Sequence, residues 1–281
     1  FSDRFALEAA GVLAANGIKV FTLSRDLPTP VVAYAVQQQK AFGAVMFTAS
    51  HNPPEYNGIK FIPEYAGPAS PVITAEIEAY LAQRQLGDGI LPVQAGGTGC
   101  GLGVAIDPLP DYLEHLATLV NRQAIADAGL TIVYDPMYAS GRGLPEQLLG
   151  GFCRFEEIHE RRDPLFGGMM PDPQSKNLDE LRARVLAVPN AIGLATDGDA
   201  DRFGIIDSDG TYLTPNQILA LLLVHLIRTR DWHGVAVRTV ATTHLVDRIG
   251  LDYGVETIET PVGFKYIGEL MRTDRKSTRL N

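Results

Sequence analysis

The chain has 281 residues, of which 46% are hydrophobic, and its formal net charge is −9 with a pI near 5.1. A chain of this length favours about two or three domains, and its apolar fraction is sufficient for ordinary globular cores. The negative charge argues against nucleic acid or an anionic membrane as a partner.

The cysteine content and the apolar runs bear on the compartment. Only two cysteines are present, Cys100 and Cys153, and neither belongs to a CxxC pair. Without a disulfide framework, the reducing cytoplasm is the expected location. The most apolar run, Ile218 to Ile227, is too short to span a bilayer, so no membrane partner is expected. The N-terminus shows no secretory signal and begins directly with an amphipathic pattern, which suggests that the chain starts within a fold.

The first part of the chain alternates helical and extended patterns. Thr29 is predicted to cap a helix that has Pro30 at its first position. The predicted elements are a helix from Ser2 to Gly17, a strand over Ile18–Leu23, a helix from Thr29 to about Phe42 and a strand over Val45–Thr48. This order indicates βαβ units and a parallel or mixed sheet.

Asn57-Gly58 is the strongest short-range reversal signal in the chain. It is expected to fold Ile59–Ile62 back beside the preceding loop, which brings Lys60 near Ser50. The glycine-rich stretch Gly87–Gly103 follows later and does not match the G-x-G-x-x-G nucleotide fingerprint. We therefore expect that stretch to be a loop near a domain boundary.

Helical and extended patterns also alternate through the rest of the chain. They predict helices over Ile73–Gln85, Leu113–Asn121, Leu178–Val188, Pro215–Arg228 and His244–Tyr253, with a short helix within Gly141–Leu149. They predict strands over Thr131–Tyr134, Ala191–Ala195, Val235–Val240 and Val255–Glu259, and a hairpin that joins Phe203–Asp207 to Thr211–Leu213. These elements indicate an α/β fold of tandem, similar domains with mixed or mostly parallel sheets.

Three domains and a tail are predicted. The first domain covers residues 1–103 and holds a serine loop, the second covers 104–212 and holds an aspartate loop, and the third covers 213–272. The stretch 273–281 is basic and has no periodicity, so we expect an unstructured or foreign tail there.

Two loops follow predicted strands at the edge where open α/β sheets hold their ligands. Ser50 lies just past the first of these strands, and Asp197, Asp199 and Asp201 lie just past the second. Three carboxylates aimed at one point repel each other, and a hard divalent cation such as Mg²⁺ relieves that repulsion. We therefore expect the two loops to meet, with a reactive serine opposite a carboxylate cluster that needs a cation.

An acidic triad can also arise for reasons unrelated to magnesium. An EF-hand loop is excluded by pattern, since Arg202 stands where that motif has glycine and Ser208 where it has glutamate. A solvated acidic turn, in which Arg202 pairs with a neighbour, stays open. If Ser50 is phosphorylated, its charge of about −1.5 to −2 beside three aspartates requires a dication between them, with Arg202 compensating further.

Several side chains could assist the serine, which is a weak nucleophile by itself. His51 adjoins it, but neighbouring side chains often point apart, so we do not expect His51 to be its base. Lys60 is the better proton carrier if its pKa is lowered, and a positive electrostatic partner or a surface lysine if it is not. Lys265 follows Gly263 near a predicted helix start, where backbone N–H groups favour phosphate, with an exposed lysine as the alternative. His159 is interpreted as structural, because H-E-x-x-H is incomplete there.

At four stretches the chain resembles the α-D-phosphohexomutase family, and within it most of all the bacterial phosphoglucomutases. Thr48–Pro53 is similar to the family's phosphoserine loop, and Asp197–Arg202 is similar to its magnesium loop. Asn57–Lys60 has a lysine at the spacing of the family's catalytic lysine, and Thr260–Lys265 resembles the domain-three loop of the glucose-preferring members. The similarity runs from Ser2 to about Arg272.

The resemblance implies an intramolecular phosphotransferase that interconverts glucose 1-phosphate and glucose 6-phosphate. Phospho-Ser50 gives its phosphoryl group to the sugar, the resulting glucose 1,6-bisphosphate turns around in the cleft, and its other phosphoryl group returns to Ser50. Mg²⁺, bound by Ser50 and the three aspartates, stabilises charge on the transferring group. Lys60 is implied as proton carrier. The implied substrate contacts are Arg202, Gly263, Lys265 and His51.

The sequence departs from the family pattern at both ends. The family has a strand and an arginine-bearing loop before residue 1, and it continues after Arg272 to a sugar-hydroxyl loop and a fourth domain. From these departures we expect a fragment with weak substrate binding and little turnover. The preference between glucose and mannose substrates is left open, although Phe264 and Lys265 favour glucose.

Three alternatives follow from these observations. The chain could be a phosphomannomutase or a bifunctional hexose phosphate mutase, or an inactive fragment that binds metal or sugar phosphate. A phosphatase with an aspartate nucleophile is a further alternative, since Asp197-Gly198-Asp199 has an Asp-x-Asp core. Such enzymes usually carry a threonine where this chain has Asp201.

Overall fold

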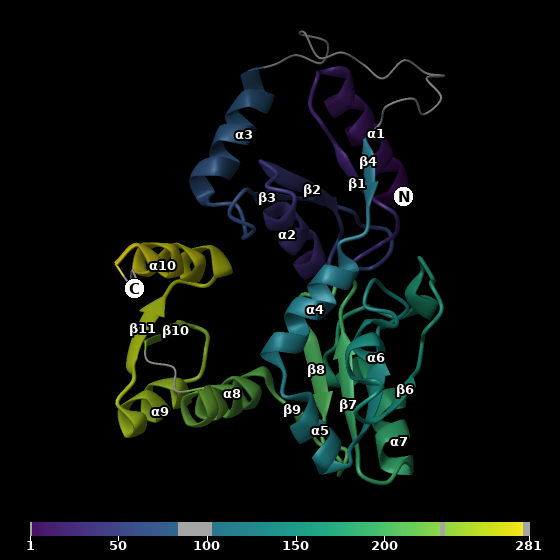
Figure 1. Ribbon diagram of the computed structural model, residues 1–281, viewed down its shortest axis with the longest axis vertical. Coiled ribbons are helices and arrows are strands. Elements are labelled where there is room, and N and C mark those ends of the chain that lie inside the picture. Colours follow the sequence, from purple (N-terminus) through teal and green to yellow (C-terminus); the bar gives the residue numbers. More distant parts are fainter. Residues whose placement is uncertain (1, 84–102, 231–233, 278–281) are drawn as a thin grey trace. The chain divides into compact units, whose positions relative to one another are not determined.

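The structure is a computed structural model of the chain, and it describes residues 2–83, 103–230 and 234–277 (Figure 1). The chain divides into two compact units. The first comprises Phe1–Ala66 with Val72–Tyr212, and the second comprises Gly67–Pro71 with Leu213–Asn281. The serine and aspartate loops both belong to the first unit, whereas Gly263 and Lys265 belong to the second.

The part of the chain before residue 107 contains two pairs of strands with helices around them. The elements are α1 (Ser2–Ala15), β1 (Phe21–Leu23), α2 (Thr29–Gln38), β2 (Gly43–Phe47), β3 (Ile59–Pro63), α3 (Pro71–Gln83) and β4 (Val104–Ile106). β1 pairs with β4 in parallel, and β2 pairs with β3 antiparallel. The parallel partner of β1 is thus β4, a strand that the sequence pattern does not predict, because only three residues of it are extended.

Helix α2 is buried on two sides. Val31 packs into one apolar cluster, and Val32 and Val36 pack into another that includes a side chain of β3. The helix ends at Gln38, earlier than predicted, because Lys40 adopts a φ of 49° that no right-handed helix can continue. Packing on both sides makes α2 a fixed support for the residues at its N-terminus.

The reversal between β2 and β3 is made by the whole loop over residues 48–58. The Thr48 N–H donates to the Gly58 carbonyl (3.1 Å), which closes the loop at its base. Asn57 therefore ends a long loop and does not form a tight two-residue turn, although the strand folds back as predicted. The loop carries Ser50, and Lys60 follows it on β3.

A five-stranded sheet with the order β6-β5-β7-β8-β9 forms the rest of the first unit. The elements are α4 (Leu109–Leu119), α5 (Arg122–Ala128), β5 (Thr131–Asp135), α6 (Leu144–Leu149), β6 (Arg154–Glu157), two 3-10 turns (Phe166–Gly168 and Ser175–Asn177), α7 (Asp179–Ala187), β7 (Ala191–Thr196), β8 (Phe203–Ile206) and β9 (Tyr212–Leu213). β5 pairs in parallel with β6 and β7, and β7 pairs antiparallel with β8. The sheet is therefore mixed, as predicted.

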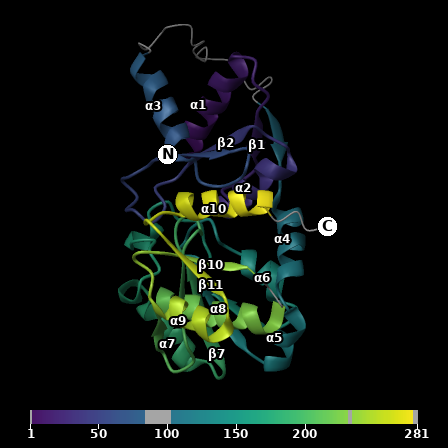
Figure 2. The same ribbon diagram turned by 90° about the vertical axis from the view of Figure 1, so that its left-hand side faces the viewer.

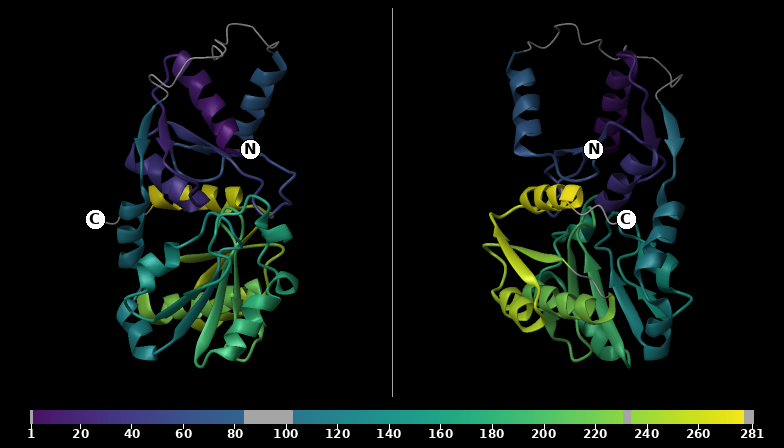
Figure 3. Two further views of the ribbon diagram at one scale, coloured as in Figure 1. Left: turned by 90° about the vertical axis from the view of Figure 1, so that its right-hand side faces the viewer. Right: turned by 60° about the vertical axis from the view of Figure 1, so that its left-hand side comes forward.

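Helices cover both faces of this sheet (Figure 3). Val133 of β5 packs with Leu181 and Val185 of α7, whereas its neighbours Ile132 and Tyr134 pack on the side of α5 and α6. This alternation with a period of two fixes the register of the strands. As a result, the parallel strands β5 and β7 end at one edge, and the aspartate loop follows β7 there.

The sequence pattern misses two elements of this layer and the start of a third. α5 and β6 are not predicted, because each is short and carries too few apolar residues for a clear period. α4 begins at Leu109 instead of Leu113, since Pro110 is acceptable in the first helical turn.

The second unit is built on one βαβ unit. Its elements are α8 (Pro215–Arg230), β10 (Val235–Thr239), α9 (Leu245–Tyr253), β11 (Glu256–Thr260) and α10 (Phe264–Ser277). β10 and β11 pair in parallel, and α9 packs against both strands and against α8 (Figure 2). This strand, helix, strand order is the one predicted for residues 235–259.

Helix α10 extends into the stretch that we expect to be an unstructured tail. It runs to Ser277, while residues 278–281 lie outside the described residues. Arginine and lysine have high intrinsic helix propensity, so a basic stretch without apolar periodicity can still continue a helix. The loop predicted over 87–103 also lies outside the described residues, except Gly103. The division into three domains stays a prediction.

Within the described ranges, none of the helices combines the length and the apolar character that crossing a bilayer requires.

Candidate active site

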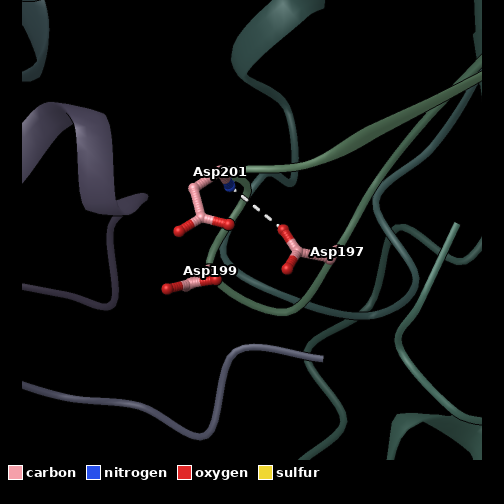
Figure 4. Close-up of side chains that lie close together, drawn as sticks. All are labelled: Asp197, Asp199 and Asp201. Atoms are coloured by element: carbon pink, nitrogen blue, oxygen red, sulfur yellow. Dashed lines mark hydrogen bonds between the residues drawn. The ribbon is translucent and has the colours of Figure 1, made fainter. Parts of the chain in front are cut away.

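Three acidic side chains converge in the turn that joins β7 to β8 (Figure 4). Asp197 and Asp199 are buried, with 0% and 2% of their surface exposed, and Asp201 is exposed. One carboxylate oxygen of each residue lies within 4.8 Å of the others. The triad thus converges as its alternating spacing predicts.

Main-chain hydrogen bonds fix the shape of this turn. Asp197 Oδ1 accepts from the N–H groups of Asp201 (Figure 4) and Arg202, each at 3.0 Å. The Asp197 N–H donates to the Arg202 carbonyl at 3.3 Å, and Ala200 takes a left-handed φ of 52°. The main chain itself therefore brings the carboxylates together.

Ser50 lies opposite the aspartate turn. Its Oγ donates to Asp197 Oδ2 at 3.0 Å, and its N–H donates to Thr48 Oγ1 at 2.9 Å. Its φ of 55° lies in the left-handed region, which costs a non-glycine residue about 1–3 kcal/mol. A strained serine with its hydroxyl in an acidic cluster is typical of a functional site.

The two loops approach so closely that position 198 requires glycine. A Cβ at Gly198 would lie 2.2 Å from the Ser50 carbonyl oxygen. The Gly198 N–H donates to the Pro171 carbonyl (3.2 Å), and the Gly198 carbonyl accepts from Ser140 Oγ (3.0 Å). The aspartate turn is therefore held between the serine loop and two further loops of the sheet.

The buried carboxylates have opposite pKa shifts. Burial, together with the charge of Asp199, raises the pKa of Asp197 to about 7. Burial alone would also raise the pKa of Asp199, but hydrogen bonds from Lys60 and Thr29 lower it below its ordinary value. The Asp199 carboxylate is thus held ionised, whereas ionisation of Asp197 is disfavoured. This pattern is typical of two carboxylates that lie close together.

The oxygens of this cluster suit a hard divalent cation. Asp199 Oδ1 is buried and has no hydrogen-bond partner among the residues that the structure describes. Buried polar atoms normally have a partner, so this oxygen is available to a cation. The candidate ligands are all oxygens, the donors that Mg²⁺ prefers. The residues present therefore fit a magnesium ion.

Lys60 contacts the triad from β3. Its Nζ lies 2.5 Å from Asp199 Oδ2 and 3.0 Å from Asp201 Oδ2. Burial alone would lower the pKa of Lys60, but these hydrogen bonds raise it above its ordinary value. Of the alternatives drawn from the sequence, the positive electrostatic partner describes this geometry, because a lowered pKa is not found.

Two further predicted site residues, His51 and Arg202, lie in the first unit. His51 Nδ1 lies 3.4 Å from Ser50 Oγ, so the expectation that the two side chains point apart is wrong. The exposed Arg202 guanidinium has no hydrogen-bond or ion-pair partner in residues 2–83, 103–230 and 234–277. A solvated acidic turn in which Arg202 pairs with a neighbour is therefore not observed.

The other residues singled out from the sequence lie outside the aspartate turn and the serine loop. Gly263 has a φ of +134°, and Lys265 lies in the first turn of α10 with its Nζ 5.1 Å from the centre of the Tyr266 ring. His159, which we interpret as structural, has Nδ1 3.0 Å from Asp135 Oδ1 and Nε2 3.1 Å from Glu180 Oε2. That environment agrees with a structural role.

Two residues that hold the site are not predicted from the sequence. Ser140 lies after β5 and binds the Gly198 carbonyl, and no sequence signal marks it. The sequence pattern predicts Thr29 only as a helix cap, yet its hydroxyl donates to Asp199 Oδ2 at 2.7 Å. The threonine-proline pair is a usable signal of a helix start, but it does not indicate the partner of the hydroxyl.

Three family models match the chain. They describe phosphoglucomutase/phosphomannomutase α/β/α domain I over residues 1–87, domain II over residues 110–210 and domain III over residues 214–278. The serine loop lies in the first match, the aspartate turn in the second and the Gly263 loop in the third.

Individual proteins are similar over nearly the whole chain. A phosphoglucosamine mutase from Thermobifida fusca is 33% identical over 95% of this chain and 58% of its own length. Phosphoglucomutase 1 of Drosophila melanogaster is 32% identical over 93% of this chain and 52% of its own length. A Thermus thermophilus crystal structure assigned as a phosphomannomutase is 34% identical, with a TM-score of 0.86, over 97% of this chain and 60% of that one. The chain thus spans little more than half the length of these relatives.

Proposed function

The chain belongs to the α-D-phosphohexomutase family, and on that premise we propose that it carries the phosphoserine loop and the magnesium loop of a hexose phosphate mutase. The proposed activity is an intramolecular phosphotransfer that interconverts glucose 1-phosphate and glucose 6-phosphate. Glucose 1,6-bisphosphate is the proposed intermediate and activator. The proposed partners are therefore small hexose phosphates.

One observation carries this proposal, namely that Ser50 meets the aspartate turn. Ser50 Oγ lies 3.0 Å from Asp197 Oδ2, and oxygens of all three aspartates lie within 4.8 Å of one another. A phosphate on Ser50 would add about −1.5 to −2 charge to this cluster. A magnesium ion held by Asp197, Asp199 and Asp201 would supply the compensating charge and withdraw electrons from the transferring group.

The transfer itself requires positioning and charge more than covalent chemistry. The bond between Ser50 Oγ and phosphorus breaks as a hydroxyl oxygen of the sugar phosphate forms a new bond to that phosphorus. Lys60, held as an ammonium ion, is proposed to stabilise the negative charge on the released Oγ, and the proton of the attacking hydroxyl passes to that oxygen. The Arg202 guanidinium is unpaired within the described residues, which suits it to bind phosphoryl oxygens.

Four residues are proposed substrate contacts, with Arg202 among them. His51 lies beside the serine hydroxyl and is placed to contact the sugar phosphate. Gly263 and Lys265 precede and begin α10, where N–H groups and a lysine favour a phosphate group. We also propose the domain division 1–103, 104–212 and 213–272, and a cytoplasmic location.

The sugar is the least constrained part of the proposal. Glucose is proposed because Phe264 and Lys265 resemble the loop of glucose-preferring members. Phosphomannomutase activity is the alternative, supported by the 34% identity to the Thermus thermophilus structure. The similarity to a phosphoglucosamine mutase adds glucosamine phosphate to the sugars that deserve a test.

Phosphoserine mapping tests this function. The chain is incubated with Mg²⁺ and glucose, mannose or glucosamine 1,6-bisphosphate, and intact mass and peptide mapping then locate the phosphate. We expect one acid-stable phosphate on Ser50, with the fastest transfer from the glucose compound, and none in Ser50→Ala. Ser208→Ala, which removes an exposed serine in the β8–β9 turn, is the matched control and should be labelled like the unmodified chain.

Two outcomes would overturn the proposal. Phosphate found on an aspartate would favour a phosphatase with an aspartate nucleophile. Metal binding without any transfer to Ser50 would favour a protein that only binds metal or sugar phosphate.

A further inference from the structure

The hydroxyl of Thr29 does not cap its own helix. Pro28 occupies the N-cap position of α2 and makes no side-chain cap hydrogen bond, so Thr29 is the first helical residue and not the predicted cap. Its Oγ1 instead donates to Asp199 Oδ2 at 2.7 Å, and its N–H donates to the Asp199 carbonyl at 2.8 Å. One residue thus binds both the side chain and the main chain of Asp199.

The N–H groups at the start of a helix have no partner within the helix, which leaves that of Thr29 free for this contact. The hydroxyl also lies 3.2 Å from Met46 Sδ. A hydroxyl has a single proton, and a carboxylate is a much stronger acceptor than a thioether, so Asp199 takes it.

These contacts decide which oxygen of Asp199 remains available. Thr29 and Lys60 both donate to Oδ2, whereas Oδ1 is buried and unpartnered among the described residues. Hydrogen bonds thus hold Oδ2 of the Asp199 side chain, and the Thr29 N–H holds the Asp199 main-chain carbonyl. The carboxylate cannot turn without breaking the hydrogen bonds to Oδ2. Oδ1 is therefore the atom that a cation would bind.

We propose that Thr29 is a positioning residue for the divalent cation, because it fixes the carboxylate of Asp199 so that Oδ1 faces the ion. This inference rests on the magnesium site of the proposed function. Thr29 serves this role better than Lys60 does, since its β-branched side chain has few rotamers and a short reach. The Lys60 side chain is 35% exposed and divides its hydrogen bonds between Asp199 and Asp201.

The support behind Thr29 is rigid. It begins α2, whose next residues Val31 and Val32 are buried in two separate apolar clusters. Asp199 also lies near the N-terminal end of that helix, where the helix dipole favours a negative charge. The aspartate turn of one sheet is thereby tied to a helix that packs against the serine-loop strands.

Metal binding by variants of the whole chain tests this role. Thr29→Val keeps the shape and the N–H but removes the hydroxyl, and Thr29→Ser keeps the hydroxyl. Free Mn²⁺ is measured by its electron paramagnetic resonance signal, and Mg²⁺ affinity by competition. We expect Thr29→Val to bind Mn²⁺ about tenfold more weakly and Thr29→Ser to stay within about threefold, as for other residues that orient a metal ligand.

Unfolding in urea without metal separates positioning from a structural role. We expect the metal-free midpoint of Thr29→Ser to lie close to that of the unmodified chain, and that of Thr29→Val to fall only slightly, because Asp199 keeps Lys60 as a donor. Should Thr29→Val not fold, Thr29→Ala replaces it as the variant without a hydroxyl. A loss of metal-free stability with unchanged Mn²⁺ affinity, or affinity equal in all chains, would overturn the proposal for Thr29 alone. If the unmodified chain binds no more Mn²⁺ than Asp199→Asn does, the proposed magnesium site fails, and this inference fails with it.

Discussion

Ser50 and Asp197 are 147 positions apart in sequence, yet the Ser50 hydroxyl donates to the Asp197 carboxylate at 3.0 Å. The serine belongs to the loop between β2 and β3, and the aspartate to the turn after β7, so the contact joins two separate sheets. Burial disfavours ionisation of Asp197, and a hydroxyl donor only partly compensates for it. The shared divalent ion of the proposed function would supply the compensation that the hydroxyl alone does not.

Gly198→Ala tests the close approach of these loops. The added Cβ would meet the Ser50 carbonyl oxygen at 2.2 Å, so one of the two loops has to move. We expect a loss of about 1–3 kcal/mol in the free energy of unfolding, as for other overpacked sites, and a marked loss of Mn²⁺ affinity. Gly151→Ala is the control, because a Cβ at that exposed position meets nothing within 4 Å. Urea unfolding and Mn²⁺ titration measure both effects, and equal behaviour of the two variants would refute the argument.

Arg202→Ala separates function from stability at the aspartate turn. The main-chain N–H of Arg202 holds Asp197, but its side chain is exposed and unpaired among the described residues. We therefore expect the unfolding free energy to change by no more than about 0.5 kcal/mol. Phosphate transfer to Ser50 should fall by about 10²–10³-fold, the usual effect of losing one donor to the reacting group.

The control for Arg202 is Arg154→Ala, an exposed arginine at the amino end of β6, the opposite edge of the same sheet. Transfer rates are read from the appearance of phosphoserine with time. An Arg202→Ala chain that transfers phosphate as fast as Arg154→Ala would remove Arg202 from the proposed mechanism.

Lys60→Met tests the charge balance of the triad. Lys60 neutralises Asp199 and Asp201, so its removal should destabilise the metal-free chain by about 1 kcal/mol, a modest value because solvent screens this partly exposed lysine. Mg²⁺ at a hundred times its Kd stabilises a protein by about 2.7 kcal/mol, and the variant should gain more from saturating Mg²⁺ than the unmodified chain does.

Urea midpoints in EDTA measure the loss of metal-free stability in Lys60→Met, and midpoints in Mg²⁺ measure the gain from the bound ion. Lys176→Met, at an exposed site in the second 3-10 turn, should match the unmodified chain under both conditions. If Lys60→Met is as stable as Lys176→Met in EDTA, then Lys60 does not balance the carboxylates.

His159 gives the stability a defined pH dependence. The hydrogen bond to Asp135 raises the pKa of His159 against the effect of burial, with further contributions from the charges of Asp135 and Glu180. A raised folded-state pKa contributes stability that is complete below the unfolded value near 6.5 and is lost as the pH rises through the folded value. We expect His159→Gln to be about 1.5–3 kcal/mol less stable than the unmodified chain at pH 5.5, the typical strength of a hydrogen bond to a charged group, with a smaller gap at pH 8.5.

Urea unfolding across this pH range measures the gap for His159, and taking the difference between two chains cancels the other titrating groups. His225→Gln, at an exposed position of α8, is the matched control for replacing a histidine by glutamine, and its stability at pH 5.5 should stay close to that of the unmodified chain. A gap for His159→Gln that widens toward pH 8.5 would contradict the assigned direction.

Local patterns in the sequence predict much of this fold and site. Periodicity identifies α1, α2, α7, α8 and α9, and the two loops that carry Ser50 and the aspartates follow predicted strands. These features are local, because each depends on a few neighbouring residues. The alternating aspartates also predict a cation site, since charge repulsion requires no knowledge of the fold.

What the sequence does not predict depends on contacts between distant segments. The pairing of β1 with β4 and the bond from Thr29 to Asp199 each join residues whose separation no local pattern records. The positive φ of Ser50 and the 3.4 Å separation between its Oγ and His51 Nδ1 likewise have no local signal, because non-glycine residues rarely adopt that conformation. The raised pKa of Lys60 likewise depends on carboxylates from another sheet.

The central claim is that Ser50 and the three aspartates share one divalent ion through a phosphoryl oxygen. The ³¹P NMR resonance of the Ser50-phosphorylated chain, recorded during titration with Mn²⁺, tests this claim most directly, because a bound paramagnetic ion broadens the signal of a phosphorus atom a few ångströms away. We predict that the phosphoserine signal disappears as Mn²⁺ reaches one equivalent, and that excess Mg²⁺ restores it. A sharp phosphoserine signal in the presence of bound Mn²⁺ would contradict the account.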